Sequence, residues 1–140
     1  MKNIITIVLI ILGFTVSIYP QNNFSKRKIS NLKNQVSQLV ENDKKMTQVM
    51  VDKIFSFSEL GFQEFETSKY VTTILEQNGF EIEYGISGIP TAWMARWSNG
   101  QGGPTIALGS DFDGIPVSSQ YPGVAYHKPI VDGAPGHGEG

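Results

Sequence analysis

Residues 64–84 read EFETSKYVTTILEQNGFEIEY, and the hydrophobic period changes within this stretch. Between residues 70 and 75, apolar side chains recur at the spacing of an amphipathic helix. Glutamates at the start suit the positive end of a helix, and Gly79 is typical of a helix end. From Phe80 to Tyr84, apolar and acidic residues alternate, which indicates a half-buried strand. A helix followed directly by a strand predicts an α/β fold.

The C-terminal side continues this pattern. Residues 91–97 are predicted as a second strand, and a glycine-rich turn over residues 98–104 leads to a third strand, Thr105–Leu108. We therefore expect the N-terminal part of a mixed α/β sheet. Residues 110–140 show no clear period, and a structureless segment of that length is usually functional or lacks a partner.

The N-terminal side contains one more predicted helix. Apolar residues from Leu32 to Ile54 are spaced by three and four, so this helix would cover one face of the sheet, with an interruption at Asn42 or Asp43. We divide the chain into a spacer with the start of this helix, residues 22–44, and a partial catalytic domain, residues 45–140.

The first 21 residues are predicted as a signal peptide. Lys2 precedes an apolar run over residues 4–19, and a polar segment follows Pro20. The run is shorter than the roughly 20 residues of a membrane-spanning helix. Export to the periplasm or the extracellular space is therefore expected, and an uncleaved membrane anchor formed by residues 4–19 is the alternative.

Composition excludes several classes of protein. The chain has 140 residues, which suggests one domain, and no cysteine, which rules out disulfides, thiolate metal sites and lipoprotein acylation. A net charge of −2 argues against nucleic acid as the main partner.

The first candidate functional residues are Asp111 and Asp113, which follow the predicted third strand. In open α/β sheets, ligands bind at the carboxyl ends of strands. In extended backbone, residues two apart point to the same side, so one carboxylate could reach a cation while the other supports it. The alternative is that either aspartate only caps the Asp-Gly turn.

A second candidate lies in GAPGHGEG, residues 133–140. His137 and Glu139 offer nitrogen and oxygen ligands for zinc or a similar ion, although two ligands are too few for a closed site. The other histidine, His127, fits a loop position better than a ligand position.

Four motifs in order resemble one family: SELGFQE over residues 58–64, GIPT over 88–91, DFDGIP over 111–116 and GAPGHGEG over 133–140. They are similar to the N-terminal third of the aminoacylase and glutamate-carboxypeptidase metallopeptidase family, in its amidohydrolase branch. The resemblance implies a two-domain hydrolase that holds two divalent ions, zinc first and manganese or cobalt as alternatives, and cleaves the amide of an N-acyl amino acid or small peptide.

The same resemblance assigns roles to individual residues. Asp113 matches the aspartate that supports a metal ligand, and Asp111 matches a position that is histidine in the peptidase branches. Glu139 stands where amidohydrolases have a cysteine ligand, and a carboxylate can bridge two hard or borderline ions. His137 matches a loop residue, so we rank it below Glu139 as a metal ligand.

The family further implies that this chain is an N-terminal fragment, inactive alone, and that a homodimer would form through a domain absent from it. Residues 22–140 alone are expected to be aggregation-prone or only partly folded. The rest of the protein would normally pair with the sheet edges and pack on the apolar faces that they leave exposed. A non-catalytic binding or vestigial module, with Asp111, Asp113 and Glu139 serving loop structure only, is the alternative.

Overall fold

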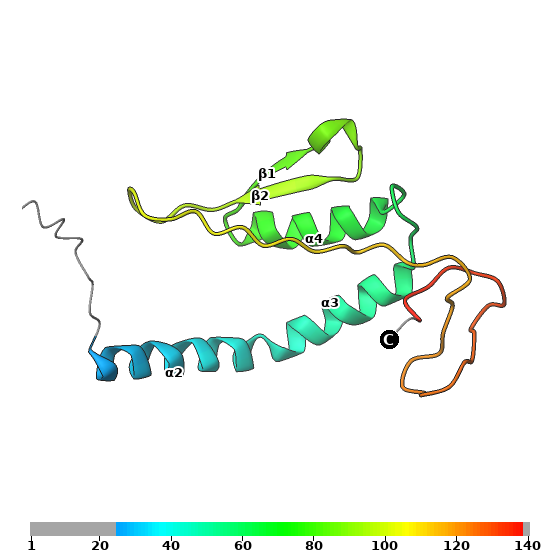
Figure 1. The fold of residues 1–140 in the computed structure, drawn as a ribbon, viewed down its shortest axis with the longest axis horizontal. Helices are drawn as coiled ribbons and strands as arrows, with labels where there is room; N and C mark the ends of the chain where they lie inside the picture. Colours follow the sequence, from blue (N-terminus) through cyan, green and yellow to red (C-terminus); the bar gives the residue numbers. More distant parts are fainter. Residues whose placement is uncertain (1–24, 139–140) are drawn as a thin grey trace, which may run out of the picture. The chain divides into compact units, whose positions relative to one another are not determined.

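The computed structural model describes residues 25–138, so the predicted leader and Glu139 lie outside the described residues. The described residues fall into two units, one up to Glu41 and one from Asn42 onward (Figure 1). Within residues 25–138, every helix falls short of the length and hydropathy needed to cross a bilayer. The elements in chain order are α2 (Lys26–Asn42), α3 (Lys44–Phe57), α4 (Phe65–Gln77), β1 (Glu81–Tyr84), the short 3-10 helix η1 (Ile86–Gly88) and β2 (Trp93–Arg96).

The first predicted helix is two helices that meet at Asp43, so the expected interruption is confirmed. Asparagine and aspartate favour such a break because their side chains compete for backbone hydrogen bonds. The helix α3 ends at Ser58, which has a left-handed conformation with a φ of 51° and donates its N–H to the carbonyl of Ile54.

The predicted helix after residue 64 and the two strands predicted to follow it are also confirmed. The helix α4 packs against both strands and against α3. The strands β1 and β2 are antiparallel, with Glu81 opposite Arg96 and Tyr84 opposite Trp93. The mixture of helices and a small sheet agrees with the expected α/β class.

The small core of this unit lies on α4. Val71 is buried there beside the buried hydroxyl residues Thr67 and Thr72. The hydroxyl of Tyr84 in β1 donates to Oγ1 of Thr72 over 3.0 Å, which ties the hairpin to the helix. On the other side, the rings of Phe57 and Tyr70 meet edge to face with centroids 6.1 Å apart, joining α3 to α4.

The predicted third strand, Thr105–Leu108, is wrong for this structure. Among the described residues no strand pairs with it, and the side chains of Ile106 and Leu108 are 82% and 96% exposed. An apolar run becomes a strand only where a neighbour accepts and donates its backbone hydrogen bonds. The extended sheet expected from the sequence is therefore a two-stranded sheet here.

Residues 115–138 fold back on themselves without helices or regular strands. Ile115 and Gly136 form an antiparallel bridge through two backbone hydrogen bonds of 2.8 and 3.1 Å, and Ser119 donates its N–H to the carbonyl of Ala134. A Cβ atom at Gly136 would lie 2.4 Å from the carbonyl oxygen of Ser118, so only glycine allows this close approach.

Candidate functional site

An open cleft of about 540 Å³ lies between the start of α4, the strand β2 and the extended segment that ends at Asp113. It is within the size range of small-molecule sites. Aromatic and acidic side chains line it together, and its lining includes Phe62, Glu64, Trp93, Asp111, Phe112 and Asp113.

Both predicted carboxylates line this cleft, on either side of Phe112. The ring of Phe112 stacks on that of Trp93 in β2, with centroids 6.2 Å apart and an interplanar angle of 19°. Gly61 lies beside the carboxylate of Asp113, since a Cβ atom at Gly61 would be 3.4 Å from Oδ2, an ordinary van der Waals contact. Phe112 is half-buried against Trp93, while Asp111 and Asp113 on either side of it are exposed.

Glu59 connects the helix α4 to the Asp-Phe-Asp turn. Its carboxylate accepts hydrogen bonds from the N–H groups of Glu66 and Thr67, at 2.9 and 2.8 Å. A negative charge at this end of a helix is favoured by the helix dipole. The carbonyl of Glu59 also accepts the N–H of Gly114 at 2.6 Å, next to Asp113. One residue therefore caps the helix and holds the turn.

Glu64 and Thr91 form a second link across the cleft. The hydroxyl of Thr91 donates to Oε2 of Glu64 at 2.6 Å, and Ser68 donates its own hydroxyl to the carbonyl of Thr91 at 2.8 Å. Burial raises the pKa of Glu64, but hydrogen bonds from Thr91 and from the N–H groups of Glu64 and Phe62 outweigh it and lower the pKa below its ordinary value. Glu64 is therefore an anion at neutral pH.

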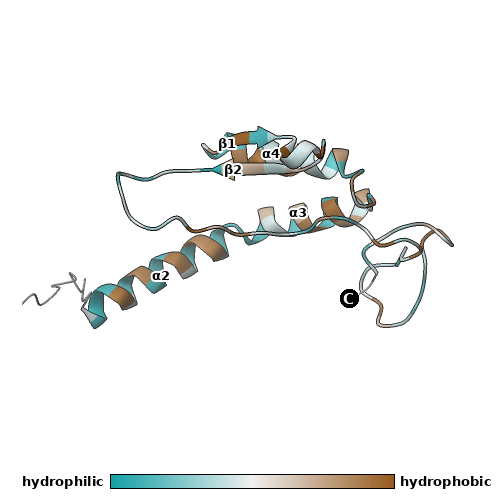
Figure 2. Cartoon of the chain, turned by 45° about the horizontal axis from the view of Figure 1, so that its top comes forward, coloured by the Kyte–Doolittle hydropathy of each residue, from teal (hydrophilic) through white to brown (hydrophobic). Residues whose placement is uncertain are grey.

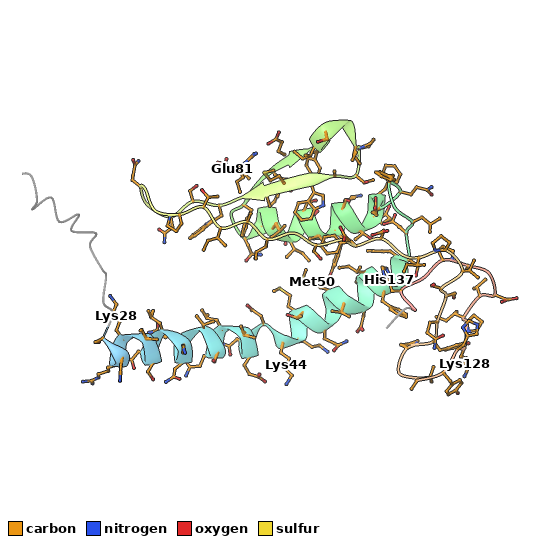
Figure 3. All side chains as sticks on the ribbon, viewed as in Figure 1. Lys28, Lys44, Met50, Glu81, Lys128 and His137 are labelled. Carbon is orange, nitrogen blue, oxygen red and sulfur yellow. The ribbon has the colours of Figure 1, made fainter. Side chains whose placement is uncertain are left out.

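His137 lies elsewhere, beside the C-terminal half of α3 (Figure 3). Its ring is tilted against that of Phe55 with centroids 6.3 Å apart, and it is not part of the cleft lining. Its Nε2 is buried without a hydrogen-bond partner among the described residues. Carboxylate and imidazole donors suit a borderline divalent ion. Within residues 25–138, however, no three such side chains come together, so the described residues provide only part of a metal site.

Glu59 and Thr91 are site residues that the sequence did not predict, although both belong to motifs that carry the family resemblance. Local capping rules favour the residue directly before a helix, and here that residue, Glu64, makes no side-chain cap. The side chain of Glu59 caps the helix instead, from seven and eight residues before the N–H groups that it accepts. No rule of sequence spacing predicts a cap at that distance.

Comparisons with known proteins agree with the motifs. The chain is 32% identical to a p-aminobenzoyl-glutamate hydrolase subunit of Escherichia coli (strain K12) over 105 residues, which are 75% of this chain and 21% of that protein. Over these matched residues, the chain belongs to the amidohydrolase branch of the aminoacylase and glutamate-carboxypeptidase family. No family model matches the chain, and no solved structure matches it significantly.

Other relatives match shorter stretches of the chain. Thermostable carboxypeptidase 1 of Saccharolobus solfataricus is 40% identical over 65 residues, which are 46% of this chain and 16% of that protein. N-acetylcysteine deacetylase of Bacillus subtilis (strain 168) is 36% identical over 62 residues, which are 44% of this chain and 16% of that protein. The chain thus spans about a fifth or less of the length of these hydrolases.

Proposed function

We propose that the protein of which this chain is a part hydrolyses the amide bond of an N-acyl amino acid or small peptide. The observation that carries the proposal is the placement of Asp111 and Asp113 together in one cleft of about 540 Å³. The chain's relatives support it, because their names describe a p-aminobenzoyl-glutamate hydrolase, a carboxypeptidase and a deacetylase, all of which cleave an amide.

Asp111, with Glu139 and His137 as further candidates, would hold a divalent metal ion, zinc first and manganese or cobalt as alternatives. Such an ion supplies acidified water and polarises a carbonyl group. Asp113 would support and orient a ligand from beside Gly61. Because residues 25–138 bring fewer than three of these donors together, we propose that the 140-residue chain alone binds metal weakly and does not turn over substrate.

The cleft also suggests how substrate would be held. The stacked rings of Trp93 and Phe112 offer an apolar wall, and Thr91, which also lines the cleft, is held by its hydrogen bond to Glu64. Three carboxylate side chains, those of Glu64, Asp111 and Asp113, line this cleft, so a substrate carboxylate would need a bound cation to offset their repulsion.

The remaining properties of the whole protein are proposals that rest on the sequence. They are export directed by residues 1–21, with an anchor over residues 4–19 as the alternative, a second domain, and a homodimer formed through that domain. The Escherichia coli relative is named as one subunit of its hydrolase, which fits association with a partner chain.

The test is hydrolysis by the natural full-length gene product. We expect cleavage of p-aminobenzoyl-glutamate, an N-acetyl amino acid or a dipeptide, loss of activity with chelator and recovery with zinc or manganese. Asp113→Asn should lower kcat at least a hundredfold, whereas Asp132→Asn, away from the cleft, should not. Chelator-insensitive activity would contradict the metal assignment.

A non-catalytic binding module is the second candidate, favoured by the exposed aspartates that no metal cluster joins within residues 25–138. Saturable binding of these compounds to the full-length product without turnover, in the presence of zinc or manganese, would establish it over the enzyme.

A further inference from the structure

The sequence contains two Asn-Gly steps, Asn78-Gly79 at the end of α4 and Asn99-Gly100 in the turn after β2. Figure 2 shows that turn, in teal and pale colours, as a loop beyond the end of β2. Both asparagines are exposed, and the two glycines have positive φ angles of 85° and 77° with open space at their Cβ positions. The two steps therefore match in sequence, exposure and glycine conformation.

The hydrogen bonds of the two steps differ. At the end of α4, the N–H of Gly79 donates to the carbonyl of Glu76 at 3.0 Å, and the side-chain amide of Asn78 donates to the carbonyl of Ile74 at 2.8 Å. In the turn after β2, neither the N–H of the glycine nor the side chain of the asparagine has a hydrogen-bond partner within residues 25–138. Hydrogen bonding alone separates two steps that are otherwise alike.

An asparagine that precedes a glycine can react with its own backbone. The glycine nitrogen forms a bond to Cγ of the asparagine, the bond from Cγ to Nδ2 breaks, and the proton of the N–H leaves with the amide nitrogen as ammonia. Glycine favours this attack because it has no Cβ atom to crowd the nitrogen. Water then opens the cyclic imide at either carbonyl and gives aspartate or isoaspartate. Overall, one water is consumed and one ammonia is released.

The hydrogen bonds decide which asparagine reacts. At Asn78, the attacking nitrogen and the leaving amide are both held by carbonyl groups of α4, so the end of the helix must open before the ring can form. At Asn99, the same atoms are free to meet without any opening of the fold. Breaking two hydrogen bonds of ordinary strength slows a reaction by about tenfold or more.

We propose that Asn99 is a site of spontaneous deamidation in this protein and that the end of α4 protects Asn78. Water is the co-reactant, and the product is a carboxylate that is ionised at neutral pH. Deamidation thus adds one negative charge to the turn after β2. In the isoaspartate form, it also adds one methylene group to the backbone that leads from β2 to the cleft.

The first experiment incubates the folded, natural full-length gene product at mildly alkaline pH in water enriched in heavy oxygen. The protein is then digested in ordinary water and its peptides are mapped by mass spectrometry, so only deamidation during the incubation introduces the label. We expect the peptide with residue 99 to gain the label about tenfold faster, or more, than the peptide with residue 78. An Asn99→Asp variant supplies the aspartate form as a standard, and a separate peptide of the same composition is the isoaspartate form.

The second experiment repeats the incubation in denaturant, which removes the hydrogen bonds of α4 and leaves both sequences unchanged. The two peptides should then gain the label at similar rates. A difference in denaturant as large as that in the folded protein would overturn the proposal, because the neighbouring residues would explain it without the fold. Equal labelling of the two peptides in the folded protein, or faster labelling of the peptide with Asn78, would also overturn it. So would a folded protein unlabelled at Asn99 whose denatured form is labelled at both sites.

Discussion

The hydroxyl of Thr91 donates a hydrogen bond of 2.6 Å to the carboxylate of Glu64, 27 residues earlier in the chain. Thr91 is buried at the start of the segment that becomes β2, and Glu64 directly precedes α4. This hydrogen bond joins the residues just before β2 to the residue just before α4. Both residues line the cleft.

The contact predicts a pH-dependent stability. The folded-state pKa of Glu64 lies below its unfolded value, so its stabilisation is complete above the unfolded pKa of about 4.3 and is lost as pH falls through the folded pKa. Thr91→Val should cost about 1 kcal/mol at pH 7, and this difference should shrink below pH 4. Urea denaturation at several pH values measures it.

Thr73→Val is the control for this experiment, because the hydroxyl of Thr73 donates to a backbone carbonyl within α4 and faces solvent. Its effect should not change with pH. An equal pH dependence for both variants would show that the hydroxyl of Thr91 does not hold the carboxylate of Glu64.

Glu59 is predicted to stabilise the whole α4 unit. Glu59→Ala removes the acceptor for the N–H groups of Glu66 and Thr67 and should lower the free energy of unfolding by about 1 to 2 kcal/mol. Glu76→Ala, an exposed change in the same helix, should stay within about 0.5 kcal/mol. Equal losses in thermal unfolding would contradict the capping role.

Gly136 is predicted to tolerate no side chain. Gly136→Ala forces a Cβ atom against the carbonyl of Ser118, so the hydrogen bonds between residues 115 and 136 should open at a cost of about 1 to 3 kcal/mol. Gly109→Ala is the matched control, because nothing lies within 4 Å of that position. Hydrogen exchange of the Ile115 amide should accelerate only in Gly136→Ala, and slow exchange in both variants would refute the close approach.

Metal binding near the aspartates should change the fluorescence of Trp93, because Phe112 stacks on it from between Asp111 and Asp113. In a Trp97→Phe chain, Trp93 is the single tryptophan. We expect zinc to change its emission, chelator to reverse the change, and Asp111→Asn with Asp113→Asn to abolish it. Asp132→Asn should respond normally. An unchanged response in the double variant would place the metal elsewhere.

The helix α4 and the strands β1 and β2 could be predicted because their evidence lies within short windows. The period of three and four up to Leu75, the glycine at position 79 and the alternation after Phe80 each act on neighbouring residues. The break at Asp43 was predictable for the same reason, since side-chain competition with the backbone is local.

The remaining features depend on contacts between distant residues. Thr105–Leu108 has the composition of a strand, but composition does not supply the neighbouring strand that would pair with it. Glu59 reaches its N–H partners from seven and eight residues away, and His137 meets Phe55 across more than half of the described chain. The position of Asp111 and Asp113 after an apolar run was predictable, whereas their separation from His137 depends on the path of residues 115–136.

The exposed segment between the hairpin and the cleft has a consequence for handling the protein. Residues 105–110 are exposed throughout and belong to no helix or strand, so a protease can bind them in extended form without first unfolding anything. Cleavage there would cut the chain between the hairpin and Asp111 and Asp113. After such a cut, residues 111–138 would be held to the rest of the chain by noncovalent contacts alone, among them the hydrogen bond from the N–H of Gly114 to the carbonyl of Glu59.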